Sequence, residues 1–229
     1  MLKELVGDES LGHGYTPNTG YPHVRQAVAD YLSGVHDVKL TPDLIVMTVG
    51  AAGALNDTLN AVMNPGEEIL VPAPYFVGYG HYAFIARATI KTVPTDGNFH
   101  LDTAAIAAGI TDKTRVMLLN SPNNPTGAVY PAEDLTRIAE IALEQDLYLI
   151  SDEAYRLFVY DKLKSASLFD IEEIRHLLIV TRSFSKNFGM TGFRIGYIAA
   201  PQEFIRAVAG LQSHMTGNVC TFAQYGSLK

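Results

Sequence analysis

Short apolar segments that alternate with amphipathic ones constrain the fold of this chain more than any other feature of its sequence. Several of the short segments are apolar on both faces, which is typical of buried strands in a parallel sheet. The expected strands are residues 44–49, 68–71, 88–93, 115–119, 147–151 and 177–180. Helical patterns are expected at residues 22–32, 54–63, 101–109 and 132–145. The alternation predicts an α/β fold in which a mostly parallel sheet is flanked by helices.

Length, charge and cysteine content narrow the class of protein further. The 229 residues fit one large domain, and no repeat, low-complexity tract or linker divides them. A net charge of −7 disfavours a nucleic-acid partner, and no apolar run approaches the ~20 residues needed to cross a bilayer. The single cysteine, Cys220, can form neither an internal disulfide nor a Cys-rich zinc site, so no metal centre is expected. These features predict a cytoplasmic protein that binds neither nucleic acid nor membrane.

In a mostly parallel sheet, functional residues gather in the turns that follow the carboxyl ends of the strands. Four such turns carry reactive or polar residues, and their order along the chain is the main functional signal. They are Gly50-Ala51-Ala52-Gly53, the Asn-Ser-Pro-Asn-Asn-Pro-Thr-Gly segment at 120–127, Asp152-Glu153-Ala154-Tyr155, and Ser183-Phe184-Ser185-Lys186 with its continuation to Arg194.

Lys186 and Asp152 are the two charged candidates for chemistry. A lysine placed after a strand can bind phosphate, or can form a Schiff base if its surroundings lower its pKa. A carboxylate at another strand end can pair with a protonated heteroaromatic nitrogen. The alternatives are a solvated surface lysine and an aspartate that caps a helix or a turn.

Other residues in these turns could hold the remaining groups of a planar, phosphorylated cofactor. Asn124 and Tyr155 can donate to a phenolic oxygen, although a turn asparagine and a core tyrosine are their ordinary interpretations. The free amides of a helix that follows Gly50 suit a phosphate, and Ser183 and Arg194 could complete that anion site. An aromatic ring is available in Phe76, which could stack on a planar ring or belong to the core. Pyridoxal phosphate needs this combination of groups.

At this point the chain resembles the class I/II aminotransferases, which are fold-type-I pyridoxal-phosphate enzymes. The resemblance runs from Gly14 to about Ala200, and it rests on three motifs that stand in the family's order. The motifs are Ser-Pro-Asn-Asn-Pro-Thr-Gly at 121–127, Asp-Glu-Ala-Tyr at 152–155, and Ser-Phe-Ser-Lys-Asn-Phe-Gly-Met-Thr-Gly-Phe-Arg-Ile-Gly at 183–196.

The resemblance implies roles for particular residues. Lys186 corresponds to the Schiff-base lysine, Asp152 to the partner of the pyridine nitrogen, and Tyr155 to a ligand of the ring hydroxyl; these three are the expected catalytic residues. The remaining expected cofactor contacts are Asn124 at the ring hydroxyl, Ser183, Arg194 and the amides of Ala51 and Ala52 at the phosphate, and Phe76 stacked on the ring, with Tyr75 as its rival. Tyr15 matches a tyrosine that reaches the phosphate of a neighbouring subunit, which implies a homodimer.

The implied function is transfer of an amino group between an amino acid, of aspartate or aromatic type, and a 2-oxo acid. A pyridoxal-phosphate-dependent C–S lyase, another fold-type-I enzyme and a non-catalytic cofactor-binding fragment are the alternatives. The resemblance also implies that residues 1–229 form a single cofactor-binding domain without the family's N-terminal segment and smaller C-terminal domain. We expect such a chain to self-associate and to be a poor transaminase alone. An apolar stripe that a partner could cover is expected at Phe204, Ile205, Val208 and Leu211.

Two further patterns are discounted. The Gly-x-Gly-x-x-Ala pattern at 78–83 matches a dinucleotide-binding motif, but Pro72 and Pro74 interrupt the strand-turn-helix setting that the motif requires. The Ser-x-x-Lys pattern at 183–186 matches serine acylases of the penicillin-binding type, which also need downstream Ser-Asp-Asn and Lys-Thr-Gly motifs that this sequence lacks.

Overall fold

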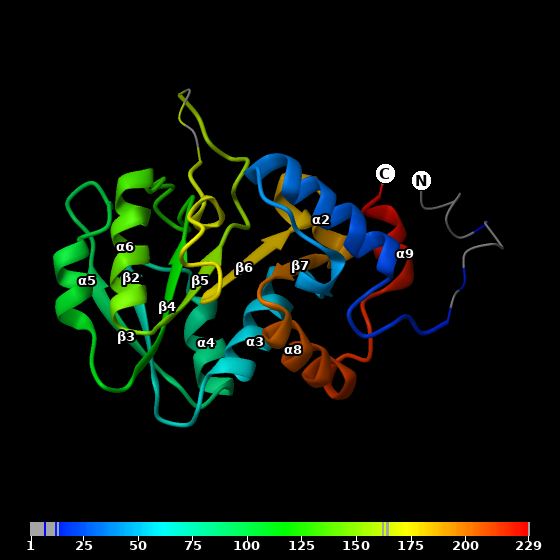
Figure 1. The fold of residues 1–229 in the computed structure, drawn as a ribbon, viewed down its shortest axis with the longest axis horizontal. Coiled ribbons are helices and arrows are strands. Elements are labelled where there is room, and N and C mark those ends of the chain that lie inside the picture. The colour runs from blue at the N-terminus through cyan, green and yellow to red at the C-terminus, as the bar shows by residue number, and fades with distance from the viewer. Residues whose placement is uncertain (1–6, 8–11, 13, 162, 164, 229) are drawn as a thin grey trace.

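A computed structural model describes residues 7, 12, 14–161, 163 and 165–228, and its centre is a single seven-stranded sheet (Figure 1). The strand order across the sheet is β1-β7-β6-β5-β4-β2-β3. The strands are β1 (Ile45–Thr48), β2 (Glu68–Ala73), β3 (Thr89–Pro94), β4 (Thr114–Asn120), β5 (Tyr148–Asp152), β6 (Leu178–Ser183) and β7 (Gly196–Ala199).

The sheet is mostly parallel, as the sequence predicts. Neighbouring strands from β3 through β2, β4 and β5 to β6 all pair in parallel. The sequence pattern does not predict β7, which pairs antiparallel with both β6 and β1. This strand is only four residues long, and it follows directly on the turn that contains Arg194. The carboxyl ends of the parallel strands therefore share one edge, as the turn argument requires.

Helices cover both faces of the sheet and bury two separate apolar clusters (Figure 1). One cluster includes side chains of α2 (Pro22–His36), α5 (Thr103–Gly109) and α6 (Ala132–Glu144). The other includes side chains of α3 (Gly50–Val62), α4 (Gly78–Ile85) and α8 (Gln202–Met215). The short elements are η1 (Pro42–Leu44), η2 (Leu168–Asp170), α7 (Phe184–Asn187), η3 (Thr191–Phe193) and α9 (Thr221–Gly226). The result is a three-layer arrangement that buries the central strands, whereas only Val93 is buried in the edge strand β3.

The apolar stripe of α8 packs inside the chain, which corrects one expectation. Phe204, Ile205 and Val208 are all buried in the cluster that α8 shares with α3, and Leu211 is half-buried. The helical spacing is therefore that of an ordinary core-facing helix, and these three side chains are not available to a partner.

Two helices differ from their predictions near the functional edge of the sheet. α3 begins at Gly50, four residues earlier than expected, so the glycine-rich turn is itself the first turn of the helix. α4 covers the segment whose glycine pattern was set aside, and it starts soon after β2 ends at Ala73.

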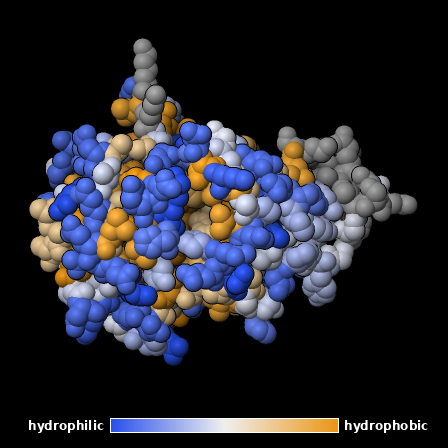
Figure 2. Space-filling model, viewed as in Figure 1, coloured by the Kyte–Doolittle hydropathy of each residue, from blue (hydrophilic) through white to orange (hydrophobic). Residues whose placement is uncertain are grey.

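The face of the molecule shown in Figure 2 is mainly hydrophilic, with apolar side chains in scattered patches. Within the described part of the chain, the helices include none with the length and apolar character of a membrane span.

Candidate active site

A cavity of about 280 Å³ opens at the edge where the parallel strands end. Every predicted site residue except Tyr15 lines this cavity. The predicted residues in its wall are Ala51, Ala52, Phe76, Asn124, Asp152, Tyr155, Ser183, Lys186 and Arg194. Tyr15 is 95% exposed and does not line this cavity, so its role stays a prediction.

Asp152 is the last residue of β5 and lies deep in the cavity wall, with 5% of its surface exposed. Its Oδ2 accepts a hydrogen bond of 2.7 Å from the Tyr79 hydroxyl, and its Oδ1 accepts one of 3.1 Å from the Ala154 amide. Burial raises the pKa of Asp152 to about 6; these two hydrogen bonds lower it, and the charge of Glu153 raises it further. Both donors are neutral, and their hydrogen bonds offset only part of the free-energy cost of burying the carboxylate.

Lys186 lies on α7, the single helical turn that follows β6. The Ser183 hydroxyl caps this turn by accepting the Ser185 amide at 3.1 Å. The Lys186 Nζ lies 5.9 Å from the centre of the Tyr155 ring. Lys186 is exposed at the mouth of the cavity while Asp152 is buried in its wall, so an amine and a carboxylate reach one cavity from neighbouring strand ends.

The first turn of α3 forms the third side of the cavity. Val49 occupies the N-cap position and makes no side-chain hydrogen bond to the first turn. No capping side chain therefore competes for the amides of Ala51 and Ala52, two residues that line the cavity. Arg194 lies against this turn and donates to the Ser185 hydroxyl at 3.3 Å and the Thr191 carbonyl at 3.0 Å.

Gly50 is required where Arg194 meets the helix start. Its φ is +68°, and a Cβ at this position would lie 2.7 Å from an Nη atom of Arg194. The absence of a side chain therefore lets a guanidinium approach the helix N-terminus closely. Together they form a site of positive potential that suits a phosphate.

Asn120 organises the loop that carries Asn124, and the sequence analysis gave it no role. The Asn124 amide donates to Asn120 Oδ1 at 2.7 Å, and Asn120 Nδ2 donates to the Asp152 carbonyl at 2.9 Å. Asn120 thus joins the end of β4 to the end of β5. Its position as the last residue of an apolar strand was the signal in the sequence.

Phe76, and not its rival Tyr75, lines the cavity. Tyr75 instead stacks on Tyr79, with ring centres 6.2 Å apart and an interplanar angle of 5°. No motif in the sequence indicated a function for Tyr79, whose hydroxyl binds Asp152, or for Tyr82, which lines the cavity. Both lie in the segment 78–83, whose glycine spacing gives no signal for the two tyrosines.

Comparisons with known proteins agree with this geometry. The model of the family described as aminotransferase class I and II matches residues 2–229. The chain is 38% identical to a probable aspartate/prephenate aminotransferase of Aquifex aeolicus, over 94% of this chain and 55% of that protein. It is 36% identical to aromatic-amino-acid aminotransferase 2 of Thermococcus litoralis, over 97% of this chain and 58% of that protein. The chain thus spans somewhat more than half the length of these curated relatives.

A solved structure of aspartate aminotransferase from Thermus thermophilus with maleate superimposes with a TM-score of 0.94 at 34% identity. The match covers 99% of this chain and 59% of that one. The fold, the sequence and the order of the motifs therefore lead to one conclusion: the chain belongs to the class I and II aminotransferase family.

Proposed function

We propose that this chain forms the cofactor-binding domain of a pyridoxal-phosphate-dependent aminotransferase that uses amino acids of aspartate or aromatic type. One observation carries the proposal. Asp152, a buried carboxylate with only neutral hydrogen-bond donors, and Lys186, an accessible amine, line the same cavity beside a helix N-terminus.

The donors and acceptors of the cavity fit this cofactor group by group. Asp152 offers a carboxylate to a protonated ring nitrogen, and such a cation would offset the desolvation that raises the pKa of this residue. Arg194, Ser183 and the amides at the start of α3 offer donors to a phosphate. Asn124 and Tyr155 offer donors to a phenolic oxygen, and Phe76 offers a ring face.

Pyridoxal phosphate, when bound, supplies an aldehyde that reacts with amines and a protonated ring that withdraws electrons from the carbon to be deprotonated. Lys186 Nζ, an exposed amine that lines the cavity, would hold the cofactor through its aldehyde carbon. When free, Lys186 Nζ would be the base that takes the proton from the substrate α-carbon and the acid that returns it to the cofactor carbon. Asp152 would keep the ring nitrogen protonated by offering its carboxylate as the hydrogen-bond acceptor.

The choice of substrate class rests on the relatives. The Aquifex relative is named for aspartate and prephenate, the Thermococcus relative for aromatic amino acids, and the Thermus structure carries the dicarboxylate maleate. We infer that the protein containing this chain takes the same class of donor, with a 2-oxo acid as acceptor.

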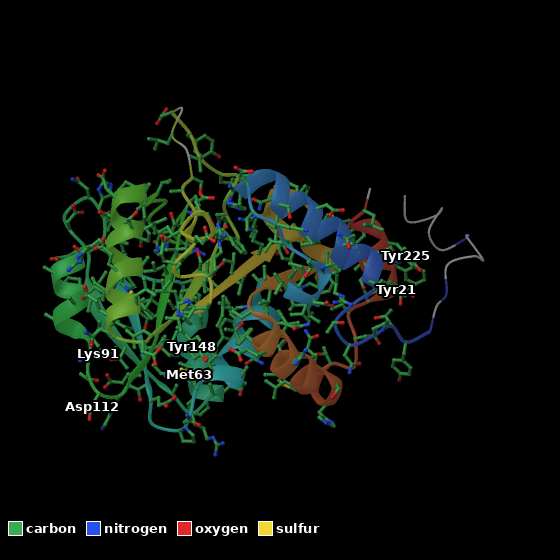
Figure 3. The ribbon with its side chains drawn as sticks, viewed as in Figure 1. Tyr21, Met63, Lys91, Asp112, Tyr148 and Tyr225 are labelled. Carbon is green, nitrogen blue, oxygen red and sulfur yellow. The ribbon has the colours of Figure 1, made fainter. Side chains whose placement is uncertain are left out.

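The cofactor assignment is tested by titrating pyridoxal phosphate into the chain and trapping the adduct with borohydride. Peptide mapping should place the label on Lys186, and Lys186→Ala should abolish both the label and the visible absorbance band. Lys91→Ala is the matched control, because Lys91 lies on the edge strand β3 (Figure 3), and it should label normally. A label that persists on another lysine in Lys186→Ala would disprove the assignment.

The reaction is tested by adding amino acids to the loaded protein at high concentration and following the cofactor spectrum. Aspartate or an aromatic amino acid should convert the spectrum, and a 2-oxo acid should restore it. Release of a 2-oxo acid and ammonia from a sulfur-containing substrate would instead indicate a C–S lyase. A coloured protein that responds to no amino acid would indicate a cofactor-binding module.

We also propose that the protein forms a homodimer in which Tyr15 reaches the partner's phosphate site. Its 95% exposure supports a contact outside its own subunit. The segment behind it is tied to the chain's other end, since Gln224 Oε1 accepts the Tyr21 amide at 2.8 Å and Tyr21 packs on Tyr225 (Figure 3). Sedimentation should give a dimer, and Tyr15→Phe should weaken cofactor binding while leaving the dimer intact. A monomer that binds the cofactor with undiminished affinity would contradict this.

A further inference from the structure

The hydrogen bond between Tyr79 and Asp152 joins α4 to the floor of the cavity. The Tyr79 hydroxyl lies 2.7 Å from Asp152 Oδ2, and both residues are buried, with 1% and 5% of their surfaces exposed. The two residues are 73 positions apart in the sequence. Burial and the nearby Asp152 charge raise the pKa of Tyr79 well above its usual value, so its hydroxyl keeps its proton and acts as the donor.

Neighbouring rings hold the Tyr79 side chain in place. Tyr75 stacks on one face with a ring separation of 6.2 Å, and Phe76 meets Tyr79 edge-on at 5.6 Å and 83°. Gly78 permits this packing, because a Cβ there would lie 2.4 Å from a ring atom of Phe76. Phe76 lines the cavity, and Tyr79 binds Asp152. One short segment of chain therefore reaches both the residue expected to stack on the cofactor ring and the carboxylate expected at the ring nitrogen.

We propose that Tyr79 is the positioning residue of Asp152: its hydroxyl binds one carboxylate oxygen and so holds the ionised carboxylate toward the ring nitrogen of the cofactor. The inference rests on the proposed function, since it assigns Tyr79 a part in holding the ring nitrogen of pyridoxal phosphate.

The two hydrogen bonds account for both the orientation and the ionisation of the Asp152 carboxylate. Tyr79 binds Oδ2 and Ala154 binds Oδ1, so the carboxylate plane is fixed from two directions. A hydrogen bond donated to a carboxylate favours its ionised form, which is the form that a protonated ring nitrogen needs. Without the hydroxyl, a carboxyl group at this depth would more readily take up a proton and could rotate within the cavity wall.

The first test compares the affinities of two probes, pyridoxal phosphate and its analogue in which a C–H group replaces the ring nitrogen. The unmodified chain should prefer pyridoxal phosphate, and Tyr79→Phe should reduce that preference by about tenfold, the value of a hydrogen bond to a charged group. Tyr148→Phe, at the opposite end of β5 (Figure 3), is the matched control and should keep the full preference. An unchanged preference would overturn the proposal, whether Tyr79→Phe leaves both affinities as they are or lowers both by the same factor.

The second test needs no cofactor and separates this proposal from the proposed function. Infrared difference spectra against Asp152→Asn would report the titration of the Asp152 carboxyl group. The other titratable groups near it are Tyr79 and Tyr82 on α4, the adjacent Glu153, and the cavity-lining Tyr155, Lys186 and Arg194, and the variant replaces none of them.

In this second test, Tyr79→Phe should raise the pKa of Asp152 further above about 6, by about one unit. An unchanged titration would refute the role of Tyr79 even if the cofactor binds. If the titration shifts but the unmodified chain shows no preference between the probes, the ring-nitrogen role of Asp152 fails, and the proposal for Tyr79 fails with it.

Discussion

Asp152→Asn should stabilise the cofactor-free protein above pH 6, because burial of this carboxylate is unfavourable to folding. The pKa of Asp152 rises from 3.8 to about 6 in the folded protein, with desolvation as the largest cause. For an acid, a raised folded-state pKa means that ionisation favours the unfolded chain. At about 1.4 kcal/mol for each unit, the ionised carboxylate costs the fold about 3 kcal/mol.

The sign and the pH window follow from those two pKa values. Below pH 3.8 the carboxyl group is neutral in both states, so the substitution changes little. Between 3.8 and about 6 the unfolded chain ionises first, so the cost grows with pH, and above 6 it is constant. An asparagine is neutral throughout and nearly isosteric. Its Oδ1 can accept from the Ala154 amide and its Nδ2 can donate to the Tyr79 oxygen, which retains both contacts.

The assay is urea unfolding of the cofactor-free protein at several pH values from 4.5 to 8. The gain in unfolding free energy of Asp152→Asn should rise to about 3 kcal/mol by pH 7 and then stay level. Saturating pyridoxal phosphate should reverse the order, because the ring cation pairs with Asp152 and stabilises only the unmodified protein fully. A pH-independent difference, or a variant less stable at pH 8 without cofactor, would refute the reasoning.

Three further outcomes are expected. Arg194→Ala should weaken binding of pyridoxal phosphate at least tenfold but leave pyridoxal, which lacks the phosphate, nearly unaffected in equilibrium titrations. Gly50→Ala should lower both cofactor affinity and, by about 1 kcal/mol, unfolding free energy, since φ is +68° and the new Cβ would meet the guanidinium. Glu153→Gln should cost about 3–5 kcal/mol in urea unfolding because it leaves Arg182 buried without its counter-charge, whereas Arg137→Gln in an exposed pair should cost less than about 1 kcal/mol.

The alternation of strands and helices was enough to predict the mostly parallel sheet, because buried parallel strands have a distinctive apolar pattern. It could not predict β7, since Gly196–Ala199 is too short to show a period and owes its place to pairing with β1 and β6. The stripe on α8 shows a second limit. Helical spacing identifies an apolar face, but whether Val208 meets its own chain or a partner depends on tertiary packing.

The sequence was enough to predict cavity-lining residues that belong to a motif at a strand end, such as Lys186 and Asp152. It was not enough for Tyr79 and Asn120, because each contacts Asp152 by a hydrogen bond that spans many residues of sequence. The burial of Asp152 could not be predicted from the sequence either. The sequence does not distinguish an aspartate that caps a turn in water from one that lies within the wall of a cavity.

Asp152 and Glu153 show how one strand end can assign two carboxylates to different purposes. Glu153 lies 2.6 Å from a guanidinium nitrogen of Arg182, so its charge is neutralised inside the protein. Asp152 has a phenol and an amide as donors, which orient a carboxylate without neutralising it. A lysine or arginine in place of Tyr79 would pair with Asp152 and neutralise its charge, which would remove the need for a cation in the cavity. Because Tyr79 is neutral, it leaves the charge of Asp152 available to the protonated ring that we propose.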